Sequence, residues 1–340
     1  MPRLGWVLLV LVGAGIIIGS LVLLKNDRLG TVVDQSATNP TPSSGKQVYH
    51  LEVGGEEREF VVYRPANLEP NAAVPVVFVF HGSGGSGPKF YEKTEWKTKA
   101  DTEGFMVVYP TGLKYHVFDD EKVVHGVLKQ NVAVYQTKFN SYEMPAALDP
   151  KYPEQVLADD VAFTDAMVSF LKDSYAVDSD KFYATGFSNG AQFTARLVVE
   201  RSDVFAAFAP TSGGLLGPDV FTKAAASGLK ITPRPVVQLV GELDPKLNHY
   251  AGVEGFDMTE TATETSNPVF TAFISGYLAA GQLKDEHTYE LTKLAAHYTY
   301  SESKIGAGNE YQLYIVKDMM HSYPPSAPEL FWSFFKEYSL

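Results

Sequence analysis

The chain has 340 residues, of which 45% are hydrophobic and 13% aromatic, as expected of a folded protein rather than a disordered one. Its formal net charge is −12, which would repel a phosphate backbone, so we expect no nucleic acid partner. Cysteine is absent, which excludes thiol catalysis, thiolate metal sites and disulfides.

The N-terminal residues 1–28 are predicted to be a membrane anchor. Residues 4–24 carry no charge and match the about 20 apolar residues with which a helix crosses a bilayer. A cleavable signal segment is the alternative, although its apolar stretch usually has only about 7–15 residues. We therefore expect the membrane as a partner through this helix and an extracytoplasmic catalytic domain, or a secreted one where the segment is cleaved. Residues 29–46, which are rich in Ser, Thr and Pro toward their end, are predicted to be a flexible linker.

Residues 47–340 are predicted to form an α/β domain. Two β-rich segments, 47–53 and 57–65, come first, and Gly54-Gly55 between them suits a hairpin turn. Apolar strands then alternate with helices, and a long irregular region precedes the last strand. The further strands are expected at residues 75–80, 105–110, 181–187, 204–210, 235–241 and 310–316, and the helices at 89–103, 156–175, 189–201 and 327–338. This order predicts a mainly parallel central sheet with helices on both faces, led by an antiparallel hairpin.

Ser188 is the candidate nucleophile. It lies in the sequence GFSNG, and a Gly-x-Ser-x-Gly match alone is weak evidence. Here, however, the motif falls between an apolar strand and an amphipathic helix, where a sharp turn can lift a serine hydroxyl above the sheet. Gly186 and Gly190 fit that turn, because a side chain at either position would crowd a tightly reversing backbone.

An acid and a base are expected after the nucleophile, because a serine hydroxyl is a poor nucleophile until a base takes its proton. Asp244 follows the strand at 235–241, and Glu242 is the nearby alternative acid. His321 follows the strand at 310–316 and precedes the last helix. The order Ser188, Asp244, His321 is the chain order of serine, acid and histidine in this architecture.

The loop HGSGG after the strand at 75–80 is predicted to help bind an oxyanion. One donor would be the backbone N–H of Asn189, the residue after the nucleophile. The second would be the N–H of Gly82 or Ser83, because small residues let the backbone approach a ligand closely. A phosphate-binding loop is the alternative, but the chain lacks the motifs of one here.

With these motifs in this order, the chain resembles the α/β-hydrolase esterases of carbohydrate esterase family 1. That family includes feruloyl esterases, acetyl xylan esterases and proteins similar to polyhydroxybutyrate depolymerases. The matching stretches are YRPANL, PVVFVFHGSGG, WKTKADTEGFMVVYPTG, DDVAFTDAMVSFLKDSYAVDSDKFYATGFSNGAQFTARL, FAAFAPTSG, GELDP and HSYP. The resemblance implies an α/β-hydrolase fold with Ser188 as nucleophile, Asp244 as acid and His321 as base, and ester hydrolysis through an acyl-enzyme without a metal or cofactor.

Two long segments depart from that resemblance, at about residues 112–155 and 246–309, and both are expected to be insertions. Their aromatic residues can form a lid or a platform for an aromatic acyl group or a sugar, or can pack a small core of the insertion itself. His116, Asp119, Asp120 and His125 in the first segment lack ordered ligand spacing, so no metal site is expected.

These patterns predict a serine esterase that hydrolyses acyl esters, feruloyl or acetyl, on polysaccharide fragments. A polyhydroxyalkanoate-type depolymerase and a serine peptidase of the same fold are alternatives, because the triad by itself does not distinguish ester from amide. A third alternative, from a different functional class, is a catalytically silent protein that binds a ligand with its aromatic insertions. The complete set of Ser, Asp and His favours catalysis.

Overall fold

A computed structural model describes residues 43–340 together with Thr31 and Val32, apart from residues 120–121, 125–126, 130–131, 215, 218–219, 221–223, 225, 257, 259–267 and 305–308. The predicted membrane segment at 4–24 and most of the predicted linker lie outside the described residues. Among the helices that are described, none has the length and apolar character needed to cross a membrane.

The elements follow the predicted alternation of strands and helices. The strands are β1 (Thr31–Val32), β2 (Gly45–Val53), β3 (Glu56–Arg64), β4 (Val74–Phe80), β5 (Met106–Pro110), β6 (Leu113–Asp119), β7 (Lys122–Val124), β8 (Val127–Lys129), β9 (Val132–Lys138), β10 (Val177–Phe187), β11 (Ala207–Thr211), β12 (Val236–Gly241), β13 (Thr288–Leu291), β14 (Ala295–Tyr300) and β15 (Tyr311–Val316). The helices are α1 (Gly87–Lys93), α2 (Trp96–Glu103), α3 (Met144–Ala147), α4 (Asp160–Ser174), α5 (Asn189–Glu200), α7 (Pro245–Ala251), α9 (Pro268–Gly281) and α10 (Ala327–Phe335).

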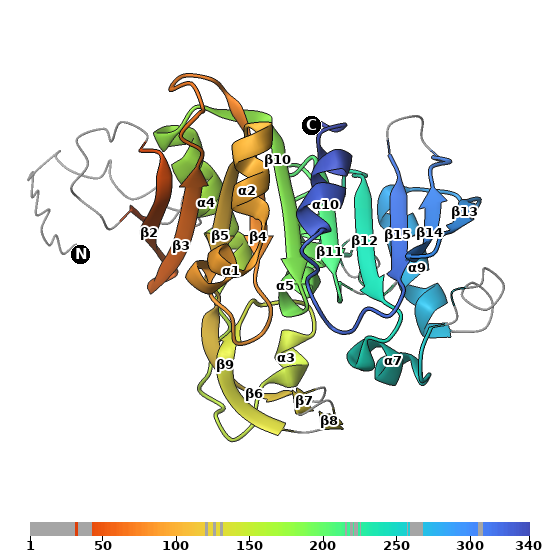
Figure 1. Cartoon of the computed structure of the whole chain (residues 1–340). Coiled ribbons are helices and arrows are strands. Elements are labelled where there is room, and N and C mark those ends of the chain that lie inside the picture. The colour runs from red at the N-terminus through yellow and green to blue at the C-terminus, as the bar shows by residue number, and fades with distance from the viewer. Residues whose placement is uncertain are drawn as a thin grey trace, which may run out of the picture.

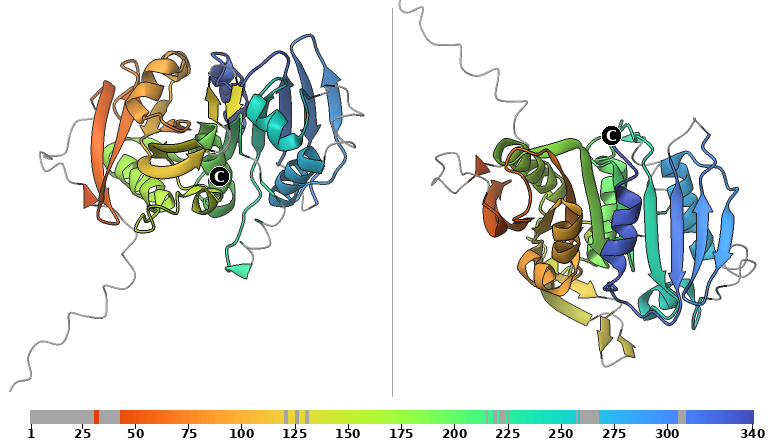
Figure 2. Two further views of the ribbon diagram at one scale, coloured as in Figure 1. Left: turned by 90° about the horizontal axis from the view of Figure 1, so that it is seen from below. Right: turned by 45° about the horizontal axis from the view of Figure 1, so that its top comes forward.

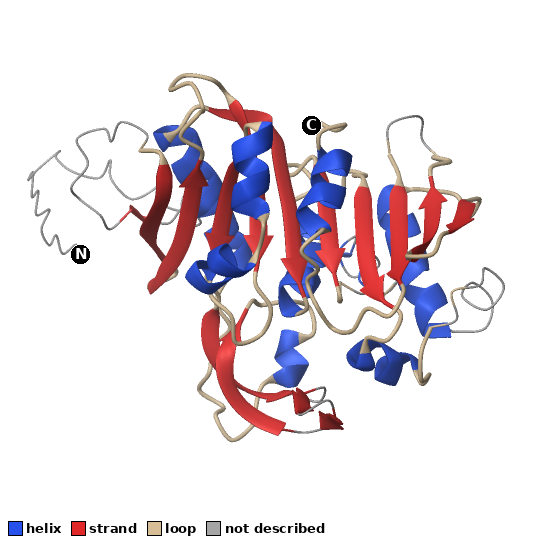
Figure 3. Ribbon diagram, in the orientation of Figure 1, coloured by secondary structure: helices blue, strands red, loops and turns tan. Residues whose placement is uncertain are grey.

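One large sheet organises the molecule, with the strand order β1-β2-β3-β5-β4-β10-β11-β12-β15-β14-β13 (Figures 1 and 3). The strands from β5 to β15 in this order are parallel, whereas the strands at both edges pair antiparallel. The mainly parallel sheet led by a hairpin is therefore confirmed. Gly54 and Gly55 turn between β2 and β3 with φ angles of 62° and 83°, which glycine adopts without steric cost.

Helices cover both faces of this sheet, and the side chains of the buried strands alternate between the two cores. Val76, Phe78 and Phe80 of β4 pack with α4 and α5 on one face, while Val77 and Val79 pack with α2 and α10 on the other. Figure 2 (left) looks at the molecule from below and shows the sheet between these two layers of helices. Burial on both faces explains why such strands read as continuous apolar runs in the sequence.

Two expectations about the elements are wrong. The helical stretch expected at 89–103 is two helices, because Thr94 is extended (φ −111°, ψ 150°) and its hydroxyl bonds back to the carbonyl of Phe90. The region expected to be irregular before the last strand contains α7, α9, β13 and β14. The β13–β14 hairpin pairs with β15 and extends the sheet, which local sequence patterns did not indicate.

The segment expected to be the first insertion begins with a long β-ribbon, here called the arm and defined as residues 112–139. In the arm β6 pairs antiparallel with β9, and β7 pairs with β8 beyond them. The arm projects from the edge of the sheet where the parallel strands end, beside α3 (Figure 1). Of its aromatic residues, Tyr115 and Phe139 are buried, whereas Tyr135 is 59% exposed.

Candidate active site

Ser188 lies on a strained turn between β10 and α5. Its backbone angles are φ 54° and ψ −117°, which a residue with a side chain adopts only when the surrounding structure holds it there. A Cβ at Gly186 would overlap the carbonyl of Gly190, and one at Gly190 would overlap the carbonyl of Phe80. The two glycines flanking the serine are thus required by close backbone contacts, as the sequence predicted.

Asp244 lies at the end of β12, where it begins α7. One carboxylate oxygen, Oδ1, accepts the backbone N–H of Lys246 at 3.0 Å and that of Leu247 at 3.4 Å. The side chain is 1% exposed, and its other oxygen points to His321. The alternative acid, Glu242, is directed elsewhere, because its Oε2 accepts the backbone N–H of Asp318 at 2.8 Å.

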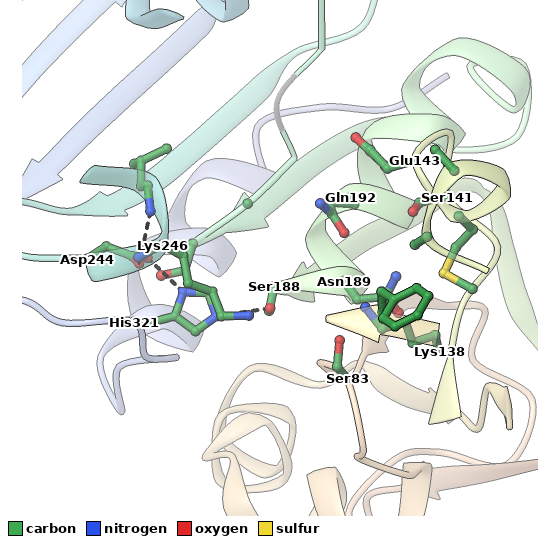
Figure 4. A pocket seen from close by; sticks show the side chains of 17 residues that line it. Ser83, Lys138, Ser141, Glu143, Ser188, Asn189, Gln192, Asp244, Lys246 and His321 are labelled. Atoms are coloured by element: carbon green, nitrogen blue, oxygen red, sulfur yellow. Dashed lines mark hydrogen bonds and ion pairs between the residues drawn. The ribbon is translucent and has the colours of Figure 1, made fainter. Parts of the chain in front are cut away.

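His321 links Asp244 to Ser188. Its Nδ1 lies 2.8 Å from Asp244 Oδ2, and its Nε2 lies 2.9 Å from the hydroxyl of Ser188 (Figure 4). Because an ionised carboxylate only accepts, Nδ1 carries the proton and Nε2 is left to accept the serine hydroxyl. Ser188, Asp244 and His321 therefore form one continuous chain of hydrogen bonds, an arrangement in which a histidine can act as a base toward a serine hydroxyl.

The loop that carries His321 is fastened to the core of the fold. The hydroxyl of Tyr323 accepts the indole N–H of Trp96 at 2.8 Å and lies 3.3 Å from the hydroxyl of Thr185 on β10. Ser212, at the end of β11, donates to the carbonyl of Ser322 at 3.1 Å. Tyr323 stands in the sequence HSYP and thus holds the loop two residues after His321.

The predicted oxyanion donors lie around Ser188. Asn189 is the first residue of α5, so its backbone N–H has no acceptor one helical turn earlier. Ser83 lines the same pocket as Ser188 and Asn189, and Figure 4 shows its side chain directed toward them. Gly82 is buried and does not line the pocket, which favours Ser83 as the second donor.

The pocket at Ser188 has a volume of about 340 Å³. Its walls come from the loop at Ser83, from Phe118 and Lys138 of the arm, from α3, and from Lys246 and Leu247 beside the acid. Apolar and charged groups are thus both present, and the arm contributes directly to the wall. In the described part of the chain no three His, Asp or Glu side chains are grouped as metal ligands.

Of the metal candidates that the sequence discounted, His116 lies between Tyr135 and Tyr152, with ring centroids 4.3 and 3.7 Å away. The positions Asp120 and His125 lie outside the described residues, as does the side chain of Asp119. Tyr135 and Tyr152 are exposed, so this aromatic stack forms part of the surface rather than a core of the insertion.

Several supporting residues were not predicted from the sequence, above all His81, Thr137 and the side chain of Asn189. His81 is fully buried, and the sequence feature that could have indicated its role is its place directly before the glycine-rich loop. Thr137 gives no local signal, because its partners are more than 50 residues away in the chain.

A parallel sheet flanked by helices, with a serine on a strained turn after a strand and an acid and a histidine after later strands, defines an α/β-hydrolase. The model of the dienelactone hydrolase family matches residues 61–270, and the chain belongs to this family.

The curated relatives are esterases, which confirms the resemblance found in the sequence. The chain is 30% identical over 202 residues to the bifunctional acetylxylan esterase/xylanase XynS20E of Neocallimastix patriciarum, an alignment that covers 59% of this chain and 23% of that protein. It is 26% identical to feruloyl esterase B of Thermothelomyces thermophilus, over 47% of this chain and 45% of that one. The chain thus spans less than half the length of these relatives.

Among solved structures, the S-formylglutathione hydrolase of Agrobacterium tumefaciens is similar with a TM-score of 0.50 and 11% identity, over 90% of this chain and 99% of that one. At that identity the likeness concerns the fold alone.

Proposed function

We propose that the protein is a serine esterase that hydrolyses carboxylic esters through an acyl-enzyme. The observation that carries this proposal is the unbroken chain from Asp244 through His321 to the hydroxyl of Ser188. The esterase relatives support the same reaction class. A serine hydroxyl with no base beside it would be inert at neutral pH.

In acylation, His321 Nε2 takes the proton of Ser188 while the serine oxygen attacks the ester carbonyl. The negative charge on the carbonyl oxygen is stabilised by the backbone N–H groups of Asn189 and Ser83. His321 then gives its proton to the alcohol oxygen as the bond from the carbonyl carbon to that oxygen breaks. Asp244 keeps the imidazole oriented and stabilises its protonated form. In deacylation a water molecule replaces the alcohol, and the same proton transfers release the acid and restore Ser188.

The substrates we propose are acetyl or feruloyl esters on polysaccharide fragments. Support comes from the relatives, which are named as acetylxylan and feruloyl esterases, and from the pocket wall, where Phe118 stands among both apolar and polar groups. A short acyl group fits a pocket of this size.

The membrane anchor at residues 4–24 and the extracytoplasmic location of the catalytic domain stay predictions from the sequence. They are tested by adding protease to intact cells that express the full chain. Digestion of the domain supports an extracytoplasmic location, and complete protection contradicts it.

The proposed reaction is tested by assaying the full chain against p-nitrophenyl acetate and methyl ferulate, beside Ser188→Ala. We expect turnover by the wild type and a fall of at least about 10⁴-fold in the variant, since the nucleophile is lost. Equal background rates in both proteins would contradict esterase activity on these esters. Turnover of a peptide substrate would then favour the peptidase alternative, and thermal stabilisation by a ligand without turnover would favour the silent binding protein.

A further inference from the structure

The glycine-rich loop after β4 is held by the arm. The backbone N–H of Gly84 donates to the carbonyl of Thr137 on β9 at 2.9 Å. The hydroxyl of the same Thr137 donates to the carbonyl of Gly85 at 2.6 Å. Both bonds converge on one residue of the arm, so the position of the loop depends on the position of β9.

His81 makes a second connection between the loop and the arm. Its Nδ1 lies 2.7 Å from the carbonyl of Gly82, and its Nε2 lies 3.0 Å from the backbone N–H of Gly112, where the arm begins. A carbonyl only accepts and an N–H only donates, so Nδ1 carries the proton and the ring is neutral. Burial lowers the pKa of His81 from 6.5 to about 4, which keeps the ring neutral at physiological pH.

Asn189 makes the third connection, from the other side of the pocket. Its Oδ1 accepts the backbone N–H of Phe139 at 2.7 Å, and its Nδ2 donates to the carbonyl of Phe139 at 3.0 Å. The side chain is 2% exposed, so both bonds are shielded from water. The Phe139 ring also lies against His81, with centroids 4.6 Å apart. The residue after the nucleophile and the glycine-rich loop are therefore joined through the end of the arm.

We propose that His81, Thr137 and Asn189 are positioning residues that use the base of the arm to fix the two oxyanion donors relative to Ser188. This inference rests on the esterase function proposed above. A donor must lie within about 2.7–3.1 Å of the oxyanion, and loss of a single donor lowers kcat by about 10²–10³-fold. The arm also contributes Phe118 and Lys138 to the pocket wall. It thereby connects the substrate site to the oxyanion site.

The sharpest test is Thr137→Val, which removes the hydroxyl bond to Gly85 while keeping the shape of the side chain and the strand. Thr164→Val is the matched control, because it removes a comparable bond, to the carbonyl of Asp160 at 2.9 Å, inside α4. In the full chain we expect kcat on p-nitrophenyl acetate to fall about tenfold in Thr137→Val with KM unchanged, since a shifted donor weakens transition-state binding only. Binding of an alkylboronic acid, which forms a tetrahedral adduct with Ser188, should weaken by the same factor. The control should keep both values.

Asn189→Asp tests the second anchor. The carboxylate retains an acceptor for the N–H of Phe139 but cannot donate to its carbonyl until it is protonated. We expect a loss in kcat of about 10²-fold at pH 8, with the ratio of variant to wild-type activity rising as the pH is lowered. A purely structural role of Asn189 predicts instead that the loss of activity at pH 8 follows a fall in Tm and a loss of folded protein.

The outcomes separate the two proposals. Wild-type turnover with unchanged kcat and boronate affinity in both variants would overturn the positioning role alone. A rise in KM with constant kcat would do the same, because the arm would then contribute equally to binding of the ground state and of the transition state. Absence of turnover in the wild type would overturn the esterase function together with the inference built on it.

Discussion

The two loops that face each other across Ser188 are supported by different parts of the molecule. The loop of His321 is tied to the core, through Tyr323 to Trp96 and Thr185. The glycine-rich loop at Gly82–Gly85 is tied to the arm, through His81 and Thr137. The base therefore depends on the common framework of the fold, whereas the oxyanion donors depend on a segment outside the main sheet.

This difference predicts that substitutions in the two regions affect different steps of catalysis. Alterations in the arm are expected to act on transition-state stabilisation and substrate choice, because the arm reaches both the pocket wall and the glycine-rich loop. They should leave the orientation of His321 intact. Substitutions beside Tyr323 should instead disturb the orientation of His321 and leave the oxyanion donors and substrate choice intact.

The largest expected effect is on the base side, from Asp244→Asn. An amide at this position no longer fixes the tautomer of His321 or stabilises its protonated form, so kcat should fall by about 10⁴-fold. Glu242→Gln is the matched control and should stay near the wild type, because Glu242 bonds to Asp318 rather than to His321. The measurement is kcat of both variants on p-nitrophenyl acetate. Similar losses in both variants would refute the assignment of Asp244 as the acid.

On the arm side, the neutral state of His81 predicts a dependence of stability on pH. The pKa of His81 is about 4 in the fold, because the ring is buried, and 6.5 is its ordinary value. The unfolded chain thus binds a proton first as the pH falls, so the contribution of His81 is fully present above pH 6.5 and is lost toward pH 4. The loss should be about 3 kcal/mol.

Denaturant unfolding of the wild type and of His81→Asn between pH 7 and 4 measures this contribution. The variant should lose about 3 kcal/mol less than the wild type over that range. Parallel pH curves for the two proteins would show that His81 does not remain neutral in the folded state.

A smaller effect is expected from Tyr323→Phe, which tests the core support of the base. The change leaves the indole N–H of Trp96 without its partner, and Trp96 is fully buried. An unsatisfied buried donor costs about 1–3 kcal/mol, which should appear as a lower Tm. The affinity for the alkylboronic acid should fall less than in Thr137→Val. A larger fall in Tyr323→Phe would break the division of roles between the two loops.

The smallest effect is expected from Tyr135→Ala, farther along the arm. Tyr135 is 59% exposed, so its removal should change the free energy of unfolding by no more than about 0.5 kcal/mol. Hydrolysis of p-nitrophenyl acetate should be unchanged, because Tyr135 does not line the pocket at Ser188. A marked loss of kcat would show that the exposed part of the arm, and not only its base, supports the oxyanion loop.

The sequence predicted those features that are local in the chain. The buried parallel strands are largely apolar, and Ser188, Asp244 and His321 each follow such a strand at its carboxyl end. Because those ends meet at one edge of the sheet, chain order alone placed the three residues together. The crowded glycines beside Ser188 followed from the same turn.

The features that escaped prediction depend on contacts between distant segments. His81 bonds to Gly112, and Asn189 bonds to Phe139, across 31 and 50 residues of chain. The β13–β14 hairpin was missed because β13 is largely exposed, so it lacks the apolar run by which the central strands were found. For Asn189 the sequence indicated only that the backbone N–H is an oxyanion donor, whereas in the structure its side chain also bonds to the backbone of Phe139.

The central claim is that Ser188 is an activated nucleophile, and labelling with a fluorophosphonate tests it most directly. Peptide mass spectrometry of the inactivated full chain should find the phosphonyl group on Ser188, one per chain, with esterase activity lost in proportion to labelling. Ser188→Ala should take up none. Inactivation with the label on another residue, or activity that persists once Ser188 is fully labelled, would contradict the mechanism.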